Sequence, residues 1–254
     1  MSFKGMKKTQ EKFKVVVAGK RSWLFKYHLP VGRKEKNSGS SLTDDDRVAN
    51  RASYLSSCRR RIERLLWANP DLNRFVTLTF KDDIKDYSVA VKEFNLFVKR
   101  LRYHSKGKKF KYICVAEFQD KNRDGVVHFH LLVNSYIPMG FLKKTWGNGY
   151  VDIRMAKGSM FNRVRYLTKY LSKVYASDRR LWGRRAFIAS QNLNVPVSAT
   201  FDCELEAYSF LESANANSVM LCQNSVVYES AFLGEVSISE FIFESASRKV
   251  LASL

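Results

Sequence analysis

Two hydrophobic periods follow one another along the middle of the chain and predict different elements. Residues 74–80 ("RFVTLTF") alternate between apolar and polar side chains, and residues 111–119 and 126–133 ("KYICVAEFQ" and "VVHFHLLV") are short apolar runs, so all three predict strands. Residues 88–103 repeat apolar side chains every three or four positions, which predicts an amphipathic helix. Residues 149–155 predict a further strand. Together these elements favour an α+β fold in which "VVHFHLLV" lies centrally in an antiparallel sheet.

Two basic helices are predicted on either side of these strands. Thr43, followed by three aspartates, is typical of an N-cap, and the helix that it begins continues to about Trp67. The second helix covers residues 159–175. Opposite its apolar stripe the first helix carries a row of arginines, namely Arg47, Arg51, Arg59, Arg60, Arg61 and Arg64. This face either contacts a nucleic-acid backbone or is an ordinary solvated face.

The segment "DKNRDG" (120–125) predicts a turn that joins two strands as a hairpin. With this loop length Gln119 pairs with Val126, and Glu117 pairs with His128. The next pair on the same face brings His130 opposite Val115. Because side chains at i and i+2 of a strand share a face, both histidines and Glu117 are expected on one face of the sheet.

Two imidazoles and a carboxylate on one face are typical ligands of a divalent metal ion with open positions. The alternative is a cross-strand hydrogen bond between a histidine and Glu117 beside an ordinary core. Both interpretations stay open from the residues alone. Gln119 is a second, less favoured candidate for the third ligand.

A second candidate group lies in "RYLTKYLSK" (165–173). Tyr166 and Tyr170 are four residues apart and therefore share a helical face, and Lys169 and Lys173 follow each tyrosine by three residues. Apolar side chains at positions 167, 171 and 174 supply the inward stripe, so the tyrosines are not required in the core. The alternative is a pair of half-buried tyrosines with lysines that extend to solvent.

Composition indicates the partner. The chain has 254 residues with 44 Lys and Arg against 24 Asp and Glu, a formal charge of +20. Residues 1–190 hold 42 of these bases and 16 acids, a net +26, whereas the remainder holds two bases and eight acids, a net −6. A polyanion, nucleic acid rather than a membrane, is the expected partner. Four cysteines without CxxC spacing and no long apolar run near the N-terminus favour the cytoplasm.

Combined, these groups suggest phosphodiester chemistry. A tyrosine hydroxyl is a weak nucleophile at neutral pH, and a divalent ion on the scissile phosphate would make attack easier. Mg²⁺ or Mn²⁺ suits phosphate oxygens better than Zn²⁺ does. Attack would conserve the bond energy in a phosphotyrosine ester, so that a strand can be cut and later rejoined without ATP.

The order of these motifs resembles that of the HUH endonucleases, the rolling-circle replication initiator (Rep) family of phages and plasmids. "FVTLTF" resembles the first motif of this family and "HFHLLV" its His-hydrophobe-His motif. "YLTKYLSK" resembles the tyrosine motif, in the two-tyrosine form of phage gene A proteins. The resemblance covers residues 74–175, and "LWGRRAFIASQNL" (181–193) is also similar to plasmid and phage initiators. No helicase domain follows these motifs.

The resemblance implies a five-stranded, ferredoxin-like sheet and an initiator that nicks one strand of an origin. Such an enzyme leaves a free 3′-OH and a 5′-phosphotyrosine link. Single-stranded DNA or an origin hairpin would be its partner, with a host helicase and polymerase in a bacterial cytoplasm. The implied site residues fall into three sets: nucleophiles and motif lysines (Tyr166, Tyr170, Lys169, Lys173), metal ligands (His128, His130, Glu117) and DNA contacts (Thr77, Thr79, Arg163, Arg165, Arg59, Arg60).

Three segments are predicted along the chain. Residues 1–43 are expected to form a basic extension and linker, residues 44–190 the endonuclease domain, and residues 191–254 an acidic segment with one or two strands of unknown role. Two alternative functions stay open. A transposase or relaxase of the same fold fits less well, because transposases of this kind usually have one tyrosine and relaxases three histidines. A non-catalytic, basic nucleic-acid-binding protein would need none of this chemistry.

Overall fold

The computed structural model describes residues 9–30, 43–104, 109–171, 176–216, 218–230 and 233–245. The chain separates into two compact units. We call residues 41–194 the central unit, and residues 1–40 together with 195–254 the terminal unit. The expected linker lies almost entirely outside the described residues, and the predicted three-segment division of the chain stays a prediction.

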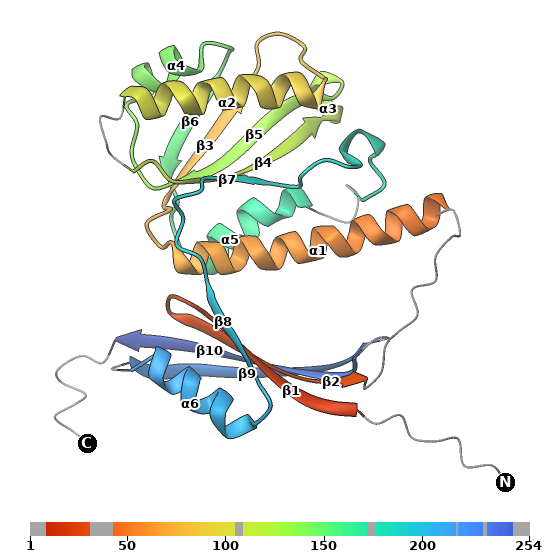
Figure 1. The fold of residues 1–254 in the computed structure, drawn as a ribbon. Helices are drawn as coiled ribbons and strands as arrows, with labels where there is room; N and C mark the ends of the chain where they lie inside the picture. The colour runs from red at the N-terminus through yellow and green to blue at the C-terminus, as the bar shows by residue number, and fades with distance from the viewer. Residues whose placement is uncertain are drawn as a thin grey trace. The chain divides into compact units, whose positions relative to one another are not determined.

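The central unit contains a five-stranded antiparallel sheet in the order β6-β3-β5-β4-β7 (Figure 1). The strands are β3 (Arg74–Thr79), β4 (Tyr112–Gln119), β5 (Val126–Val133), β6 (Val151–Met155) and β7 (Ile188–Ala189). The helices and helical turns are α1 (Asp44–Ala68), α2 (Tyr87–His104), α3 (Asp120–Arg123), α4 (Met139–Trp146), α5 (Met160–Thr168), η1 (Lys169–Leu171) and η3 (Arg179–Leu181).

The chain order β3-α2-β4-β5-α4-β6, with strands arranged β6-β3-β5-β4, is the split βαβ topology of ferredoxin-like folds. The predicted antiparallel five-stranded sheet with flanking helices is therefore confirmed for the central unit. Its strand β5 lies in the middle of the sheet, and every one of its residues is buried.

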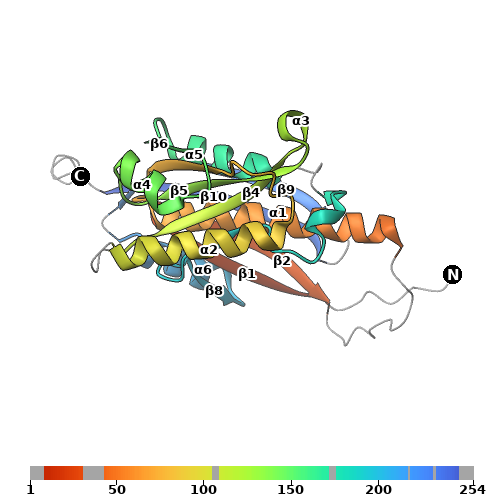
Figure 2. The same cartoon turned by 90° about the horizontal axis from the view of Figure 1, so that it is seen from above.

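Helices cover both faces of this sheet and enclose two separate cores (Figures 1 and 2). Beneath α2 and α4 the core is built on aromatic residues, among which Phe94 and Phe129 have ring centroids 4.9 Å apart. Beneath α1 and α5 the core is smaller and more aliphatic, with Ile62, Leu66 and Leu132 fully buried. Seen from above, α2 and α4 lie on the near side of the sheet (Figure 2).

Helix α1 begins where the sequence predicts it. The Thr43 hydroxyl accepts from the backbone N–H of Asp46, and the Asp46 carboxylate accepts from the Thr43 N–H in return, which is a capping box. One expectation for this helix is wrong. Arg51 does not belong to its exposed basic face, because it is buried and its guanidinium donates to the carbonyl oxygen of Arg184.

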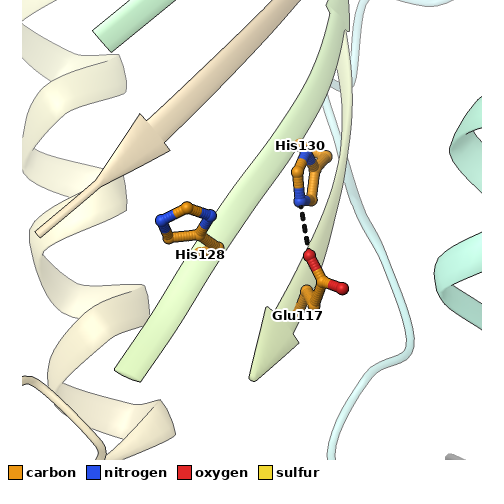
Figure 3. Close-up of side chains that lie close together, drawn as sticks. All are labelled: Glu117, His128 and His130. Carbon is orange, nitrogen blue, oxygen red and sulfur yellow. Dashed lines mark hydrogen bonds and ion pairs between the residues drawn. The ribbon is translucent and has the colours of Figure 1, made fainter. Parts of the chain in front are cut away.

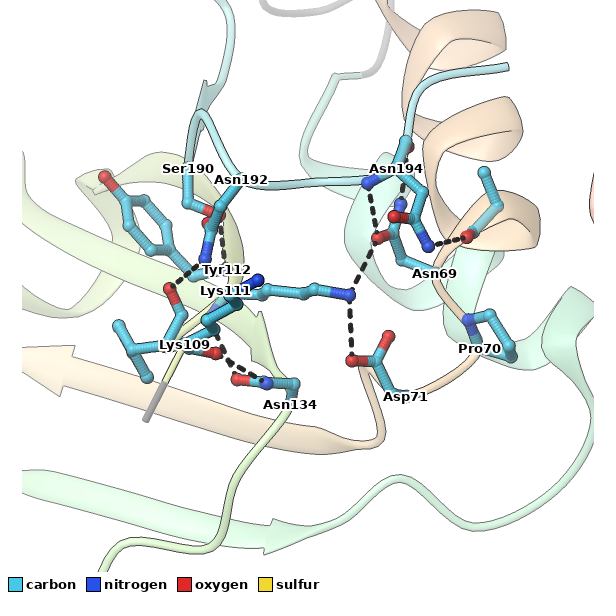
Figure 4. A network of polar contacts seen from close by, with 12 residues as sticks. Asn69, Pro70, Asp71, Lys109, Lys111, Tyr112, Asn134, Ser190, Asn192 and Asn194 are labelled. Carbon is cyan, nitrogen blue, oxygen red and sulfur yellow. Dashed lines mark hydrogen bonds and ion pairs between the residues drawn. The ribbon is translucent and has the colours of Figure 1, made fainter. Parts of the chain in front are cut away.

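A polar network holds the last residues of the central unit against the end of α1 (Figure 4). The side chain of Asn69, which is fully buried, donates to the Asn194 carbonyl at 2.8 Å and accepts from the Asn194 N–H at 2.9 Å. Lys111, at the start of the predicted strand, reaches the Asp71 carboxylate at 3.2 Å. These bonds fix the segment that follows β7 without adding to the sheet.

The terminal unit has a second antiparallel sheet, in the order β8-β1-β2-β10-β9. It is formed by β1 (Thr9–Ala18), β2 (Arg21–Pro30), β8 (Val197–Phe201), β9 (Ser218–Ser230) and β10 (Gly234–Ser245), with α6 (Glu204–Ala214) on one face. The basic start of the chain and its acidic end therefore share one sheet. Arg21 of β2 pairs with Glu240 of β10 at 2.6 Å, and Lys12 of β1 pairs with Asp202.

The two strands predicted between residues 224 and 243 are confirmed as β9 and β10. Strands β1 and β2 are not among the predicted elements. No helix in the described ranges is long and apolar enough to cross a membrane.

Candidate active site

The sheet register brings the predicted ligands together. On the face of the sheet covered by α1 and α5, His128 lies between Thr79 of β3 and Glu117 of β4, and Thr77 lies beside His130. The pairs predicted from the hairpin, Glu117 with His128 and Val115 with His130, are both confirmed. The intervening residue, Phe129, enters the core beneath α2. We refer to the side of the sheet that carries the histidines as the polar face.

Glu117, His128 and His130 could hold a metal ion (Figure 3). One ligand atom from each lies within 4.8 Å of the other two. The Nε2 atom of His130 is 2.8 Å from the Oε2 atom of Glu117, and both imidazoles are nearly buried, at 8% and 6% exposed. In the part of the chain that the structure describes, no other three acidic, histidine or cysteine side chains meet in this way.

The cross-strand hydrogen bond of the alternative interpretation is thus present, but it does not satisfy the histidines. Nε2 of His128 and Nδ1 of His130 are buried without a hydrogen-bond partner among the described residues. Burial, assisted by the neighbouring His130, lowers the pKa of His128 to about 4, so its imidazole is neutral at pH 7. Neutral imidazoles with unpaired nitrogens and an adjacent carboxylate fit a divalent cation.

Gln119 follows Glu117 on the same face of β4. Its Oε1 atom is also buried without a hydrogen-bond partner among the described residues. The hydrogen bond between Glu117 and His130 makes Glu117 the better placed third ligand, and leaves Gln119 as the next oxygen along the strand.

The tyrosine segment lies against this group. Ser159 caps α5 by accepting from the Asn162 N–H, and the helix continues through Tyr166 to Thr168. The chain then tightens into the 3₁₀ turn η1, which contains Tyr170. The ring of Tyr170 stacks on His130, with centroids 3.9 Å apart and planes only 7° apart, whereas the ring of Tyr166 meets His130 edge-on at 6.3 Å.

Of the two motif lysines, Lys169 is described and lies beside both tyrosines. Its ammonium nitrogen is 4.6 Å from the centroid of the Tyr166 ring and 4.6 Å from that of Tyr170. Lys173 lies outside the described residues. The expectation that neither tyrosine is required in the core is wrong for Tyr170, which is 7% exposed and belongs to the core beneath α1 and α5. Tyr166 is half-buried.

The expected DNA contacts are distributed over the polar face and two helices. Thr77 and Thr79 are half-buried beside the histidines, in the same rows of the sheet. Arg165 is exposed on α5. Arg163 on the same helix donates to the Pro70 carbonyl at 3.0 Å, so part of its guanidinium already has a structural role.

Arg59 and Arg60 are both exposed on α1, and Arg60 donates to the Ser57 hydroxyl within the same helix. Their role in DNA contact stays a prediction.

Sequence reasoning missed a clamp at the end of the hairpin. The Arg180 guanidinium donates to both carboxylate oxygens of Asp120, at 2.8 and 2.9 Å, and also to Asp178, while it lies 4.0 Å from the centroid of the Phe118 ring. It thereby connects η3, which follows the tyrosine segment, to the turn between β4 and β5. The Arg-Arg pair at 179–180 gave no signal of this contact, because the partner is 60 residues away.

Comparison with protein families places these residues in a known context. Residues 73–175 match a family of replication-associated proteins of the ORF2 type. This range begins just before β3 and contains the metal group and both tyrosines, although it covers fewer than half of the residues of the chain. No curated protein and no solved structure matches the chain. The match supports a role as a replication initiator that binds DNA.

Proposed function

We propose that this protein nicks one strand of DNA at a replication origin by tyrosine transesterification and later rejoins it. One observation carries the proposal: two tyrosine rings contact His130, a member of the Glu117, His128 and His130 group. A nucleophile and a candidate metal group are thus adjacent on one face of one sheet. The match to replication-associated proteins over the same residues supports this choice among phosphodiester reactions.

The substrate is single-stranded DNA or the exposed strand of an origin hairpin. The net charge of +20 attracts the phosphate backbone, and exposed Arg59, Arg60 and Arg165 offer contacts to it. Thr77 and Thr79 line the polar face, where their hydroxyls would bind backbone oxygens next to the scissile phosphate. Such contacts position the strand and leave sequence recognition to exposed bases.

The chemistry requires a tyrosine oxygen at the scissile phosphorus. The hydroxyl loses its proton, its oxygen bonds to phosphorus, and the bond from phosphorus to the 3′-oxygen breaks. That 3′-oxygen gains a proton and leaves as a free 3′-OH, while the 5′ end stays on the protein as a phosphotyrosine. Lys169, beside both rings, stabilises the negative charge that develops on the tyrosine oxygen.

Glu117, His128 and His130 would hold the divalent ion, Mg²⁺ or Mn²⁺. When bound, the ion supplies electrostatic stabilisation of the scissile phosphate. In the rejoining direction the same residues serve unchanged, because the phosphotyrosine retains the energy of the original bond. A host polymerase would extend the free 3′-OH and a host helicase would open the duplex.

A covalent trapping experiment tests the proposal without knowledge of the origin. The protein is incubated with a randomised library of single-stranded DNA and Mn²⁺, and denaturant-resistant adducts are isolated and sequenced. We expect adducts that depend on Mn²⁺, disappear with EDTA, and share a sequence at the attached 5′ end. The matched control replaces both Tyr166 and Tyr170 by Phe. DNA binding without any adduct would identify a non-catalytic nucleic-acid-binding protein instead.

A further inference from the structure

The two tyrosines of the site have different surroundings although they are only four residues apart. Tyr170 is 7% exposed, and its ring lies flat on His130 with centroids 3.9 Å apart. Tyr166 is half-buried and stands perpendicular to both rings, at 86° to Tyr170 and 83° to His130. A regular helical pair would present two equivalent side chains, so the difference needs a local cause.

The cause is the change of helix type between them. Helix α5 ends at Thr168, whose hydroxyl donates back to the Val164 carbonyl at 2.8 Å, and η1 follows at once. A 3₁₀ turn has three residues per turn rather than 3.6, so Tyr170 is rotated away from the direction that the α-helix would give it. Its ring and the side chain of Leu171 consequently join the buried core.

Tyr166 lies toward the other side of the sheet. Its ring packs on Phe75 of β3, with centroids 4.0 Å apart, and Phe75 is the neighbour of Arg154 on β6. Strand β6 is an edge of the central sheet, and the Arg154 side chain is 63% exposed. Tyr166 therefore lies on the side of His130 that is nearer to the open edge and to a cation that can meet a phosphate.

Lys169 does not distinguish the two tyrosines, because its ammonium nitrogen is 4.6 Å from either ring centroid. Any difference in their use must come from the environments of the rings. For Tyr170 to reach a phosphate, its stack on His130 must open. A stacked aromatic pair changes an equilibrium by roughly three- to tenfold, and the buried ring must also leave its core contacts.

We propose that Tyr166 is the nucleophile of the first cut and that Tyr170, held against His130, is the second nucleophile. This order rests on the proposed function. In the first step the bond between phosphorus and the 3′-oxygen breaks and the 5′ end bonds to Tyr166. In the second, the Tyr170 oxygen attacks a new copy of the junction in the same way, and the 3′-OH released there displaces Tyr166 from its phosphate.

The resting asymmetry can be measured without DNA or metal. Metal-free protein is treated with tetranitromethane, and the nitrated tyrosines are followed over time by peptide mass spectrometry. We expect Tyr166 to react several times faster than Tyr170. Tyr150, 66% exposed, and Tyr112, 5% exposed, are internal references for open and buried rings. Equal rates for Tyr166 and Tyr170 would overturn the proposal whatever the enzyme does.

The order of attack is measured in a single turnover on a trapped oligonucleotide with Mn²⁺. We expect the adduct of the unmodified protein on Tyr166. The variant Tyr170→Phe, which keeps the stacked ring, should cut at the normal rate but fail in strand joining, and Tyr166→Phe should cut roughly tenfold more slowly through Tyr170. Both changes remove one hydroxyl and keep the ring, so melting temperatures should match that of the unmodified protein.

Two outcomes overturn the order in different ways. A first adduct on Tyr170, or a normal first cut by Tyr166→Phe, contradicts the order alone and leaves the proposed function intact. No adduct from the unmodified protein on any substrate of the library contradicts the proposed function, and the order of attack with it.

Discussion

The two faces of the central sheet are built from the same strands but contain different materials. Toward α2 and α4 the sheet presents an unbroken apolar surface, in which Phe129 is fully buried against Phe94 and near Phe80. Toward α1 and α5 only one end of the surface is apolar, and the other end holds His128, His130 and the partly exposed Glu117. One strand, β5, contributes to both.

This difference shows how a small domain separates stability from chemistry. Because neighbouring side chains of a strand point to opposite faces, one short run of residues serves the core and the site alternately. A shift of one residue in the pairing of β5 would place the histidines in the aromatic core and Phe129 in the site. The length of the turn after Gln119 prevents that shift, so it is as important to function as the ligands.

The largest expected effect comes from a change on the polar face. Replacing His128 by Ala should reduce strand cleavage by at least about a hundredfold, since the divalent ion would lose a ligand and its several kcal/mol of charge stabilisation. DNA affinity should be nearly unchanged, because it depends on the basic surface. Rates are measured with labelled single-stranded DNA and affinities by anisotropy at several salt concentrations.

The same variant distinguishes the faces by metal-linked stability. At about 100 times its dissociation constant, Mn²⁺ should stabilise the unmodified protein against urea by about 2.7 kcal/mol, and His128→Ala by much less. Normal cleavage by His128→Ala, or equal stabilisation of both proteins by Mn²⁺, would contradict the metal interpretation of the polar face.

The adjacent residue on the other face should show the opposite behaviour. Replacing Phe129 by Ala should lower the free energy of unfolding by about 3–5 kcal/mol, because a fully buried aromatic ring leaves a cavity. The fraction that remains folded at low temperature should bind Mn²⁺ with unchanged affinity. Urea unfolding and calorimetric titration measure the two quantities, and a loss of Mn²⁺ affinity without a loss of stability would show that the faces are not separable.

A smaller effect is expected at the N-terminus of α1, the helix that covers the apolar end of the polar face. Replacing Thr43 by Ala removes the capping box and should cost about 1 kcal/mol of unfolding free energy. Thr43→Ser retains the hydroxyl and is the matched control. Neither variant should alter Mn²⁺ affinity, since the cap contacts no ligand; a change there would show that α1 positions the polar face more directly.

The smallest expected effect concerns the turn that sets the register. The hydrogen bonds from Arg180 lower the pKa of Asp120 below its ordinary value of 3.8, so the unfolded chain binds more protons at this site than the folded chain. The contribution is therefore present above about pH 4 and is lost as the pH falls through the lowered pKa. Because the pair is largely exposed, Asp120→Asn should cost only about 0.2–1 kcal/mol at pH 7.

Urea unfolding of both proteins across pH 2–7 checks this prediction. The difference between the unmodified protein and Asp120→Asn should disappear at the acidic end of the range. A difference that persists at low pH would assign the effect to the amide rather than to the ion pair.

Local patterns predicted most of the central unit. The helix that begins after Thr43, the strands and the pairing of Glu117 with His128 follow from periodicity, capping and loop length, which act over a few residues. The same patterns missed β1 and β2, although residues 12–17 alternate in polarity and Gly19, with φ of 58°, supplies the turn. Their lysines obscured the pattern, and their partner β10 is about two hundred residues away in the chain.

The sequence by itself determined which side chains of β5 share a face, because strand geometry and the turn length leave no other arrangement. Only the tertiary structure decided how each group is used. Burial beneath α1 and α5 makes His128 neutral, and the 3₁₀ turn after Thr168 places Tyr170 on His130 while Tyr166 stays toward the edge. Desolvation and ring stacking depend on residues far apart in the chain, so no local pattern contains them.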